Sequence, residues 1–162
     1  MQTVLPGSGI PAGAMPWWVR RPPGGQEPPR TTTGDGGIGR AKRRILIVED
    51  EWLVSLQIEQ TLAAAGREIV GTAGDAATAV ALAGRLRPDL VLMDVRLQGE
   101  LDGISAAREI AERFGIPSLF VSAHTDQRTM TRSLAVRPAG WLPKPFTEEE
   151  LIKAVQAALD AV

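Results

Sequence analysis

The sequence predicts an α/β domain built on a doubly wound, five-stranded parallel sheet with five helices, preceded by a disordered tail. From residue 45 onward, short and almost continuously apolar segments alternate five times with longer helical segments. Such apolar segments are typical of strands that are covered on both faces, as in parallel sheets. Right-handed crossovers between parallel strands place helices on both sides. Polar residues follow several of the apolar segments directly, at the sheet edge where open α/β folds bind ligands.

The strands are predicted at residues 45–48, 68–72, 90–93, 118–121 and 140–142. The first helix is predicted over residues 51–65 and ends at Gly66. Its inward side is expected to carry Leu53, Leu56, Ile58, Leu62 and Ala63. The second helix starts after an Asp75 cap and ends before Pro88, because a residue preceding proline is disfavoured in a helix.

The third helix is predicted over residues 102–114 and ends at Gly115. The fourth, at about residues 126–136, has the weakest signal because serine and threonine interrupt it. The fifth opens on a capping box formed by Thr147 and Glu150 and continues with an apolar face. No second domain is expected after this helix, so the folded domain is predicted over residues 44–162.

Residues 1–43 differ from the rest in composition, with clusters of Pro and Gly and no strand or helix period. Such a segment buries too little apolar surface to fold, so we expect a disordered tail. Residues 1–44 carry seven basic and two acidic residues, against eleven and seventeen in the remainder. The acidic body argues against a nucleic-acid platform. Trp17-Trp18 is either a docking motif or a stray apolar pair, and translation could also start further along.

The composition excludes several classes of protein. There is no cysteine, which excludes disulfides and cysteine-ligated metal sites. No apolar stretch approaches the ~20 residues of a membrane-spanning helix. The amino terminus lacks the pattern of a secretion signal. We therefore expect a cytoplasmic protein with no membrane partner.

Three carboxylates are expected to converge at the carboxyl edge of the sheet. Glu49 and Asp50 follow the first strand and Asp94 follows the third, and these strands are neighbours in a doubly wound sheet. Crowded carboxylates repel each other unless they are protonated or bridged by a cation. Hard oxygen ligands favour Mg²⁺ or Mn²⁺.

Ser122 and Lys144 follow the fourth and fifth strands at the same edge. The Lys144 ammonium can pair with Asp94 or with a phosphoryl oxygen, and the Ser122 hydroxyl can donate to another. A metal, a lysine and a hydroxyl together would stabilise the charge of a transferring phosphoryl group. The carboxylate nucleophile would form an acyl phosphate.

Residues 45–160 resemble the receiver domain of two-component response regulators, the CheY-like family, whose sheet is of the flavodoxin-like type. Each of the motifs that carry this resemblance is weak evidence alone, but five of them, in order at the strand ends, are specific to the family. They are the Glu49-Asp50 pair, Asp94, Ser122-Ala123, Trp141 and Lys144-Pro145-Phe146.

The resemblance implies that Asp94 is a phosphoacceptor, supplied by a histidine kinase or a histidine phosphotransfer protein. It implies that Mg²⁺ (or Mn²⁺) is bound directly by Asp50 and Asp94, through water by Glu49 and by the Arg96 backbone carbonyl. It also implies further roles: a phosphoryl contact for Lys144, a switch pair in Ser122 and Trp141, and a cis peptide at Lys144-Pro145.

The chain departs from the family pattern at three places. The loop over residues 96–103 is longer than usual and lacks proline, and Pro143 before the lysine is uncommon. His124 stands where family members tune hydrolysis of the acyl phosphate, and we expect it to act there with Arg96. A metal-ligand or general-base role and a plain solvent-facing position remain alternatives for His124.

The leading functional prediction is a single-domain response regulator that signals by phosphorylation-dependent protein binding. It would not be a conventional enzyme, because only self-catalysed phosphotransfer and slow autodephosphorylation are expected. The downstream partner is unknown, and a homodimer through the fourth helix, fifth strand and fifth helix is one option. Alternatives are a fragment of a hybrid histidine kinase, a phosphorelay shuttle or a phosphate sink.

Two more distant alternatives share the topology or the nucleophile. A flavin- or nucleotide-binding domain requires a Gly- or hydroxyl-rich loop after the first strand, where Glu49-Asp50-Glu51 stands instead. An aspartyl phosphatase requires a second acid two residues after the nucleophile, where this chain has Arg96.

Overall fold

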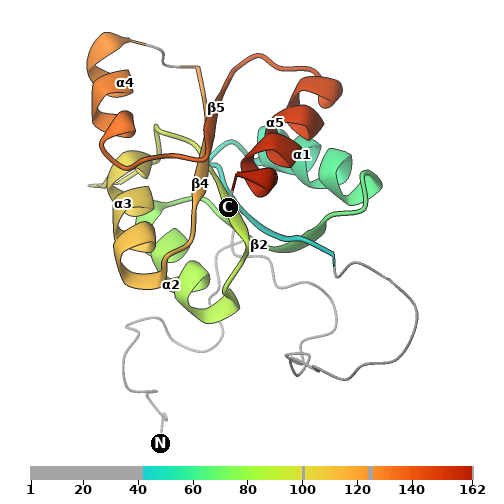
Figure 1. Cartoon of the computed structure of the whole chain (residues 1–162), viewed down its shortest axis with the longest axis horizontal. Coiled ribbons are helices and arrows are strands. Elements are labelled where there is room, and N and C mark those ends of the chain that lie inside the picture. The colour runs from blue at the N-terminus through green and yellow to red at the C-terminus, as the bar shows by residue number, and fades with distance from the viewer. Residues whose placement is uncertain (1–41, 100, 124–125, 162) are drawn as a thin grey trace, which may run out of the picture.

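The computed structural model describes residues 42–99, 101–123 and 126–161 (Figure 1). Five parallel strands lie in the order β2-β1-β3-β4-β5. They are β1 (Arg44–Val48), β2 (Glu68–Ala73), β3 (Leu90–Met93), β4 (Ser118–Ser122) and β5 (Gly140–Pro143). The predicted fold class is confirmed. The tail predicted over residues 1–43 falls almost wholly outside the described residues.

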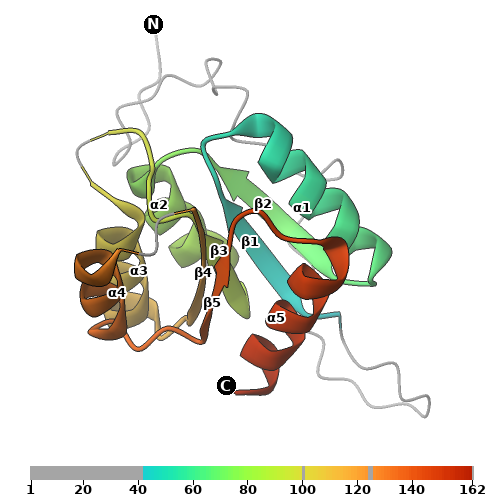
Figure 2. The ribbon, with the colours of Figure 1, turned by 90° about the horizontal axis from the view of Figure 1, so that it is seen from above.

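Five helices cover the two faces of the sheet in the described residues. They are α1 (Trp52–Ala64), α2 (Ala76–Leu86), α3 (Gly103–Phe114), α4 (Gln127–Leu134) and α5 (Glu148–Asp160). Figure 2 shows α1 and α5 on one side of the sheet and α2, α3 and α4 on the other. None of the helices in the described part of the chain is long and apolar enough to cross a membrane.

Two hydrophobic cores, one on each side of the sheet, hold these layers together. One joins the sheet to α2 and α3 through side chains such as Leu46, Met93 and Phe120. The other joins it to α1 and α5 through side chains such as Ile47, Leu92 and Val155. Every residue of β3 and β4 is buried, which is why their sequences are apolar without alternation.

Four helices in the described residues start after a capping residue, and the sequence predicts two of these caps, Asp75 and the Thr147–Glu150 box. Asp75, Asp102 and Asp126 each accept a hydrogen bond from the backbone N–H three residues later, at 2.8, 2.9 and 2.9 Å. Thr147 and Glu150 form the complete capping box at the start of α5. Each cap satisfies amide groups that have no partner within the helix.

The prediction for the inward side of α1 was wrong at two positions. Leu53 is 62% exposed and Ala63 is also exposed. The buried face consists of Ile58, Thr61 and Leu62, with Val54 packed against the same core. These positions have the i, i+4, i+7, i+8 spacing of one helix face. The error arose because α1 carries apolar residues around its whole circumference, so that apolarity alone does not select a face.

Several predicted boundaries also differ from the structure by one or two residues, among them the ends of α4 and β5. Helix α4 ends at Leu134, two residues earlier than predicted, and Arg137 adopts a positive φ of 52°. Strand β5 extends to Pro143, one residue further than predicted. Proline is tolerated there because β5 is an edge strand and needs no amide hydrogen bond on its outer side.

Candidate functional site

The carboxylates at the ends of β1 and β3 lie next to each other. Val48 and Met93 are direct partners in the β1–β3 ladder, and the Asp94 N–H donates to the Val48 carbonyl at 2.9 Å. This register brings Glu49, Asp50 and Asp94 together, with one oxygen of each within 4.8 Å of the others. Glu49 and Asp94 are only 4% and 6% exposed, whereas Asp50 is half-buried. Such an oxygen-only cluster suits a hard divalent cation.

Lys144 reaches this cluster from the other side of β4. Its Nζ lies 2.6 Å from Glu49 Oε2 and 2.9 Å from Asp94 Oδ2. The Lys144 N–H also donates to the Ser122 carbonyl at 3.0 Å, and the Lys144-Pro145 peptide is cis. The lysine therefore bridges two of the three carboxylates, in a position where an added anionic group on Asp94 would meet its ammonium.

Burial and charge crowding set the electrostatics of the cluster. Burial, together with the nearby Asp94 charge, raises the pKa of Glu49 to about 7 although Lys144 acts in the opposite direction. Burial and the Asp94 charge also raise the pKa of Asp50. For Lys144, burial alone would lower the pKa, but the Glu49 and Asp94 carboxylates outweigh it and raise the pKa. The cluster therefore holds more negative charge than Lys144 neutralises.

Two backbone amides support the carboxylates. The Arg96 N–H donates to Asp94 Oδ1 at 3.0 Å, and the Glu51 N–H donates to Glu49 Oε1 at 3.2 Å. Arg96 itself is exposed. The second Asp94 oxygen is the one that contacts Lys144, so the two carboxylate oxygens of Asp94 have different partners.

Ser122 and Trp141 lie close to the cluster on neighbouring strands. Ser122 is fully buried at the end of β4, between the strands that carry Asp94 and Lys144. Trp141 is half-buried and packs against Phe120, its partner in the β4–β5 ladder, with ring centroids 5.4 Å apart. Its indole nitrogen is buried and makes no hydrogen bond within the described residues. His124, predicted to flank the site, lies outside the described residues.

The sequence reasoning missed one residue of the site, Gly103. This first residue of α3 is buried, and a Cβ atom there would lie 1.8 Å from the Asp94 carbonyl oxygen. The helix therefore begins against the backbone of Asp94 itself. A signal was present, because glycine directly after the Asp102 cap is a poor helix former that the cap does not require.

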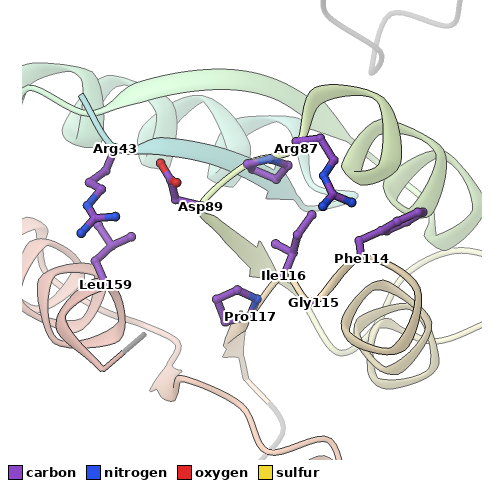
Figure 3. Close-up of a pocket in the computed structure, with 9 residues that line it drawn as sticks. Arg43, Arg87, Asp89, Phe114, Gly115, Ile116, Pro117 and Leu159 are labelled. Carbon is purple, nitrogen blue, oxygen red and sulfur yellow. The ribbon is translucent and has the colours of Figure 1, made fainter. Parts of the chain in front are cut away.

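The pocket shown in Figure 3 lies at the opposite, amino edge of the sheet. It has a volume of about 320 Å³ and includes Arg43, Asp89 and Pro117, which precede β1, β3 and β4. Arg87, which caps the C-terminus of α2, also lines it and stacks on the Phe114 ring at 5.7 Å. Cations at helix C-termini interact favourably with the helix dipole, so the position of Arg87 has a structural explanation. None of the predicted site residues lines it.

Comparison with known proteins gives a family match over most of the chain. The model of the response regulator receiver domain matches residues 45–156. The transcriptional regulatory protein PdtaR of Mycobacterium tuberculosis is 39% identical over 129 residues, which are 80% of this chain and 61% of PdtaR. The DNA-binding response regulator MtrA of Mycolicibacterium smegmatis is 32% identical over 120 residues, covering 73% of this chain and 51% of MtrA. The chain thus spans between half and two thirds of these relatives.

Solved structures show the same similarity. The signal receiver domain of a modulated diguanylate cyclase from Desulfovibrio desulfuricans has a TM-score of 0.70 and 32% identity, and the match covers 74% of this chain and 94% of that one. The chemotaxis protein CheY4 of Vibrio cholerae has a TM-score of 0.67 and 30% identity, with 73% and 99% covered. The sheet order, the acidic cluster with its lysine and these matches lead to one conclusion: the chain belongs to the response regulator receiver domain family.

Proposed function

We propose that this protein is a response regulator that accepts a phosphoryl group on Asp94 from a histidine kinase or a histidine phosphotransfer protein. The observation that carries the proposal is the position of Lys144, whose Nζ contacts both Asp94 and Glu49 inside an oxygen cluster completed by Asp50. The folded domain over residues 44–162 is the phosphoacceptor, and the tail over residues 1–43 is an appended segment.

The chemistry requires a nucleophile and a way to neutralise charge. An Asp94 carboxylate oxygen forms a bond to phosphorus while the bond between phosphorus and the donor's leaving group breaks, and the leaving group takes up a proton. Lys144 is positioned to pair with the incoming phosphoryl oxygens. Ser122, at the end of the neighbouring strand β4, would donate a hydrogen bond from its hydroxyl to another phosphoryl oxygen. The protein thus promotes its own phosphorylation and slow dephosphorylation without being a conventional enzyme.

Mg²⁺ (or Mn²⁺) fits the cluster, because three carboxylates share this space and Lys144 neutralises only part of their charge. Asp50 and Asp94 would bind the ion directly, Glu49 through water, and the Arg96 carbonyl would be a further ligand. When bound, the ion supplies positive charge to the phosphoryl oxygens. Burial first, and then the Asp94 charge, raise the pKa values of Glu49 and Asp50 although Lys144 acts in the opposite direction, and a cation bound here would favour the ionised carboxylates.

The proposed output is a change of surface that begins at Ser122 and Trp141. A buried indole N–H without a hydrogen-bond partner is an unfavourable arrangement, which supports a second position for Trp141. Movement of Trp141 would alter the face formed by α4, β5 and α5. The partner would be a downstream protein or a second copy of this chain, in the cytoplasm. Arg96 and His124 are proposed to tune the lifetime of the phosphoryl group.

Incubation with Mg²⁺ and a small phosphodonor such as acetyl phosphate tests this proposal. The wild-type protein should gain one acid-stable, base-labile phosphoryl group, measured as intact mass, and should gain none in EDTA. Asp94→Asn should gain none, because an amide is not a nucleophile. Asp89→Asn is the matched control. Asp89 precedes β3, at the end opposite Asp94, and its carboxylate accepts a hydrogen bond from the Arg44 N–H at 2.8 Å. Labelling of Asp94→Asn at the wild-type level would overturn the proposal.

A further inference from the structure

We propose that Gly103 is a positioning residue for Asp94: its missing side chain lets the first turn of α3 rest on the Asp94 peptide and thereby fixes the acceptor carboxylate. The inference rests on the proposed function of Asp94 and adds to it a residue that makes no contact with the phosphoryl group.

The contact between Gly103 and Asp94 is a backbone contact. A Cβ atom on residue 103 would lie 1.8 Å from the Asp94 carbonyl oxygen and 2.9 Å from its carbonyl carbon. Contacts of a real Cβ are essentially never below 3.0 Å, so the gap to the oxygen would have to widen from 1.8 Å to at least 3.0 Å. Because the obstacle is backbone, no rotamer change of a side chain can provide this space.

Glycine is needed here for space and not for an unusual backbone angle. The glycines with positive φ among the described residues are Gly66, Gly99 and Gly115, and Gly103 is not among them. Gly103 starts a helix, where alanine would be the better residue by intrinsic propensity. The close approach is therefore the feature that selects glycine at this position.

The Asp94 peptide is held on both sides. The Asp94 N–H donates to Val48 of β1 at 2.9 Å, and the Gly103 N–H donates to the Val95 carbonyl at 2.9 Å. The backbone around Asp94 is thus fixed between β1 and the start of α3. A larger residue at position 103 must push either α3 outward or the Asp94 peptide away from its place.

The Asp94 carboxylate tolerates little displacement. Its two oxygens accept hydrogen bonds from Lys144 Nζ at 2.9 Å and from the Arg96 N–H at 3.0 Å. A shift of the order of 1 Å breaks such bonds, and misplacement of reacting groups by that amount can slow a reaction by about a hundredfold. Gly103 therefore controls the reactivity of Asp94 through geometry alone.

The test compares Gly103→Ala with two controls. In Gly84→Ala the new Cβ would meet Phe114 Cζ at 2.7 Å, a clash of helix α2 with α3 away from the acceptor. Asp102→Ala removes the cap that accepts from the Ser105 N–H at 2.9 Å and weakens the same helix start without adding an atom next to Asp94. The stability of each variant is measured by denaturant unfolding. Labelling is then measured under conditions in which every variant is fully folded.

We expect Gly103→Ala to reduce the rate of Asp94 labelling by acetyl phosphate at least tenfold and to weaken Mg²⁺ binding in titration calorimetry. Gly84→Ala and Asp102→Ala should lose stability but label within about twofold of the wild type. Labelling and Mg²⁺ affinity of Gly103→Ala equal to those of the controls would overturn the inference and leave Asp94 as the acceptor. Absence of label on the wild type would overturn the proposed function itself.

A measurement on the wild type covers the case in which Gly103→Ala does not fold. The NMR resonances of the Gly103 amide and α protons should shift when Mg²⁺ is added and when Asp94 is phosphorylated, whereas those of Gly84 should stay in place. Gly103 resonances that do not respond would overturn the positioning role.

Discussion

Glu49 shows most clearly how the site differs from an ordinary strand end. Its side chain is almost completely buried, it accepts a hydrogen bond from Lys144 at 2.6 Å, and its pKa is raised to about 7. A carboxyl group whose pKa is raised by folding binds its proton more tightly in the folded than in the unfolded protein. Without a metal, ionisation of Glu49 therefore lowers the stability of the folded protein.

The sign of the resulting pH dependence can be tested. Between the ordinary value of 4.5 and about 7, the folded protein holds a proton that the unfolded chain releases, so the stability of the metal-free protein should fall as the pH rises through this range. At 1.36 kcal/mol per pKa unit, this rise in pKa of about 2.5 corresponds to a loss of at most about 3.5 kcal/mol. Glu49→Gln, which cannot ionise, should flatten this slope and be the more stable protein at pH 8.

Denaturant unfolding in EDTA between pH 5 and 8 measures this effect. Glu112→Gln, an exposed change on α3, is the control and should keep the wild-type slope. A slope for Glu49→Gln parallel to that of the wild type would show that Glu49 does not carry the pH dependence.

The charged residues of the site could be predicted from the sequence, whereas for Gly103 the sequence marks an unusual glycine but not its contact with Asp94. Glu49, Asp50, Asp94 and Lys144 follow apolar strands, so that parallel pairing alone brings them to one edge. Gly103 acts through the absence of atoms, and its partner is the backbone of a residue nine positions earlier. Such a contact depends on the path of the intervening loop, which periodicity does not describe.

At the scale of elements, α4 is held less firmly than its neighbours. Ser133 is its one buried residue, whereas α3 and α5 bury five and four. Leu134 is 65% exposed. One ion pair, Arg132 to Asp102 at 2.6 Å, connects α4 to the start of α3. Helical stability in proteins comes mainly from packing of a buried face, so α4 is the helix expected to open first.

Amide hydrogen exchange should therefore be faster in α4 than in α3. Arg132→Ala removes the exposed ion pair and should increase exchange in α4 further, while the global free energy of unfolding changes by less than about 1 kcal/mol. Arg113→Ala, which removes an exposed pair with Glu109 within α3, is the matched control and should leave α4 unchanged. Protection in α4 equal to that in α3 would contradict this description.

The elements also show where sequence patterns fail. The starts of α2 and α5 were predicted from their caps, which are local hydrogen bonds, and the starts of α3 and α4 were predicted at the residues that prove to cap them. The buried face of α1 was predicted wrongly because Trp52 and Leu53, both exposed, are as apolar as its core residues. The loop after Asp94 is fixed by distant contacts, including a bridge from Gln98 to Asp75, that no local pattern reveals.

At the scale of the whole molecule, the proposed output depends on coupling between the acidic cluster and the α4–β5–α5 face. Helix α4 carries Arg128 and Arg132, and α5 begins with Glu148, Glu149 and Glu150. Opposite charges on adjacent elements suit a self-complementary contact between two copies. In the proposed function, phosphorylation would add negative charge next to Ser122 and shift the population of two surface states.

Ser122→Ala should separate phosphorylation from association. The variant should accept the phosphoryl group yet lose most of the phosphorylation-dependent self-association, because a coupling of about 1–3 kcal/mol corresponds to a five- to 150-fold change in affinity. Sedimentation of the phosphorylated proteins measures this. Ser118→Ala is the control, since Ser118 is another buried serine at the opposite end of β4. Equal association of phosphorylated wild type and phosphorylated Ser122→Ala would exclude this switch.

Direct mapping of the modified residue tests the central claim, that Asp94 is the acceptor. An aspartyl phosphate is reduced by borohydride to homoserine, which marks the residue permanently for peptide mass spectrometry. After treatment with Mg²⁺ and acetyl phosphate, we predict homoserine at position 94 and at no other carboxylate of the cluster. Homoserine at position 50, the longer alcohol that reduction of a glutamyl phosphate would leave at position 49, or the absence of homoserine from the peptide that contains position 94 would contradict the account.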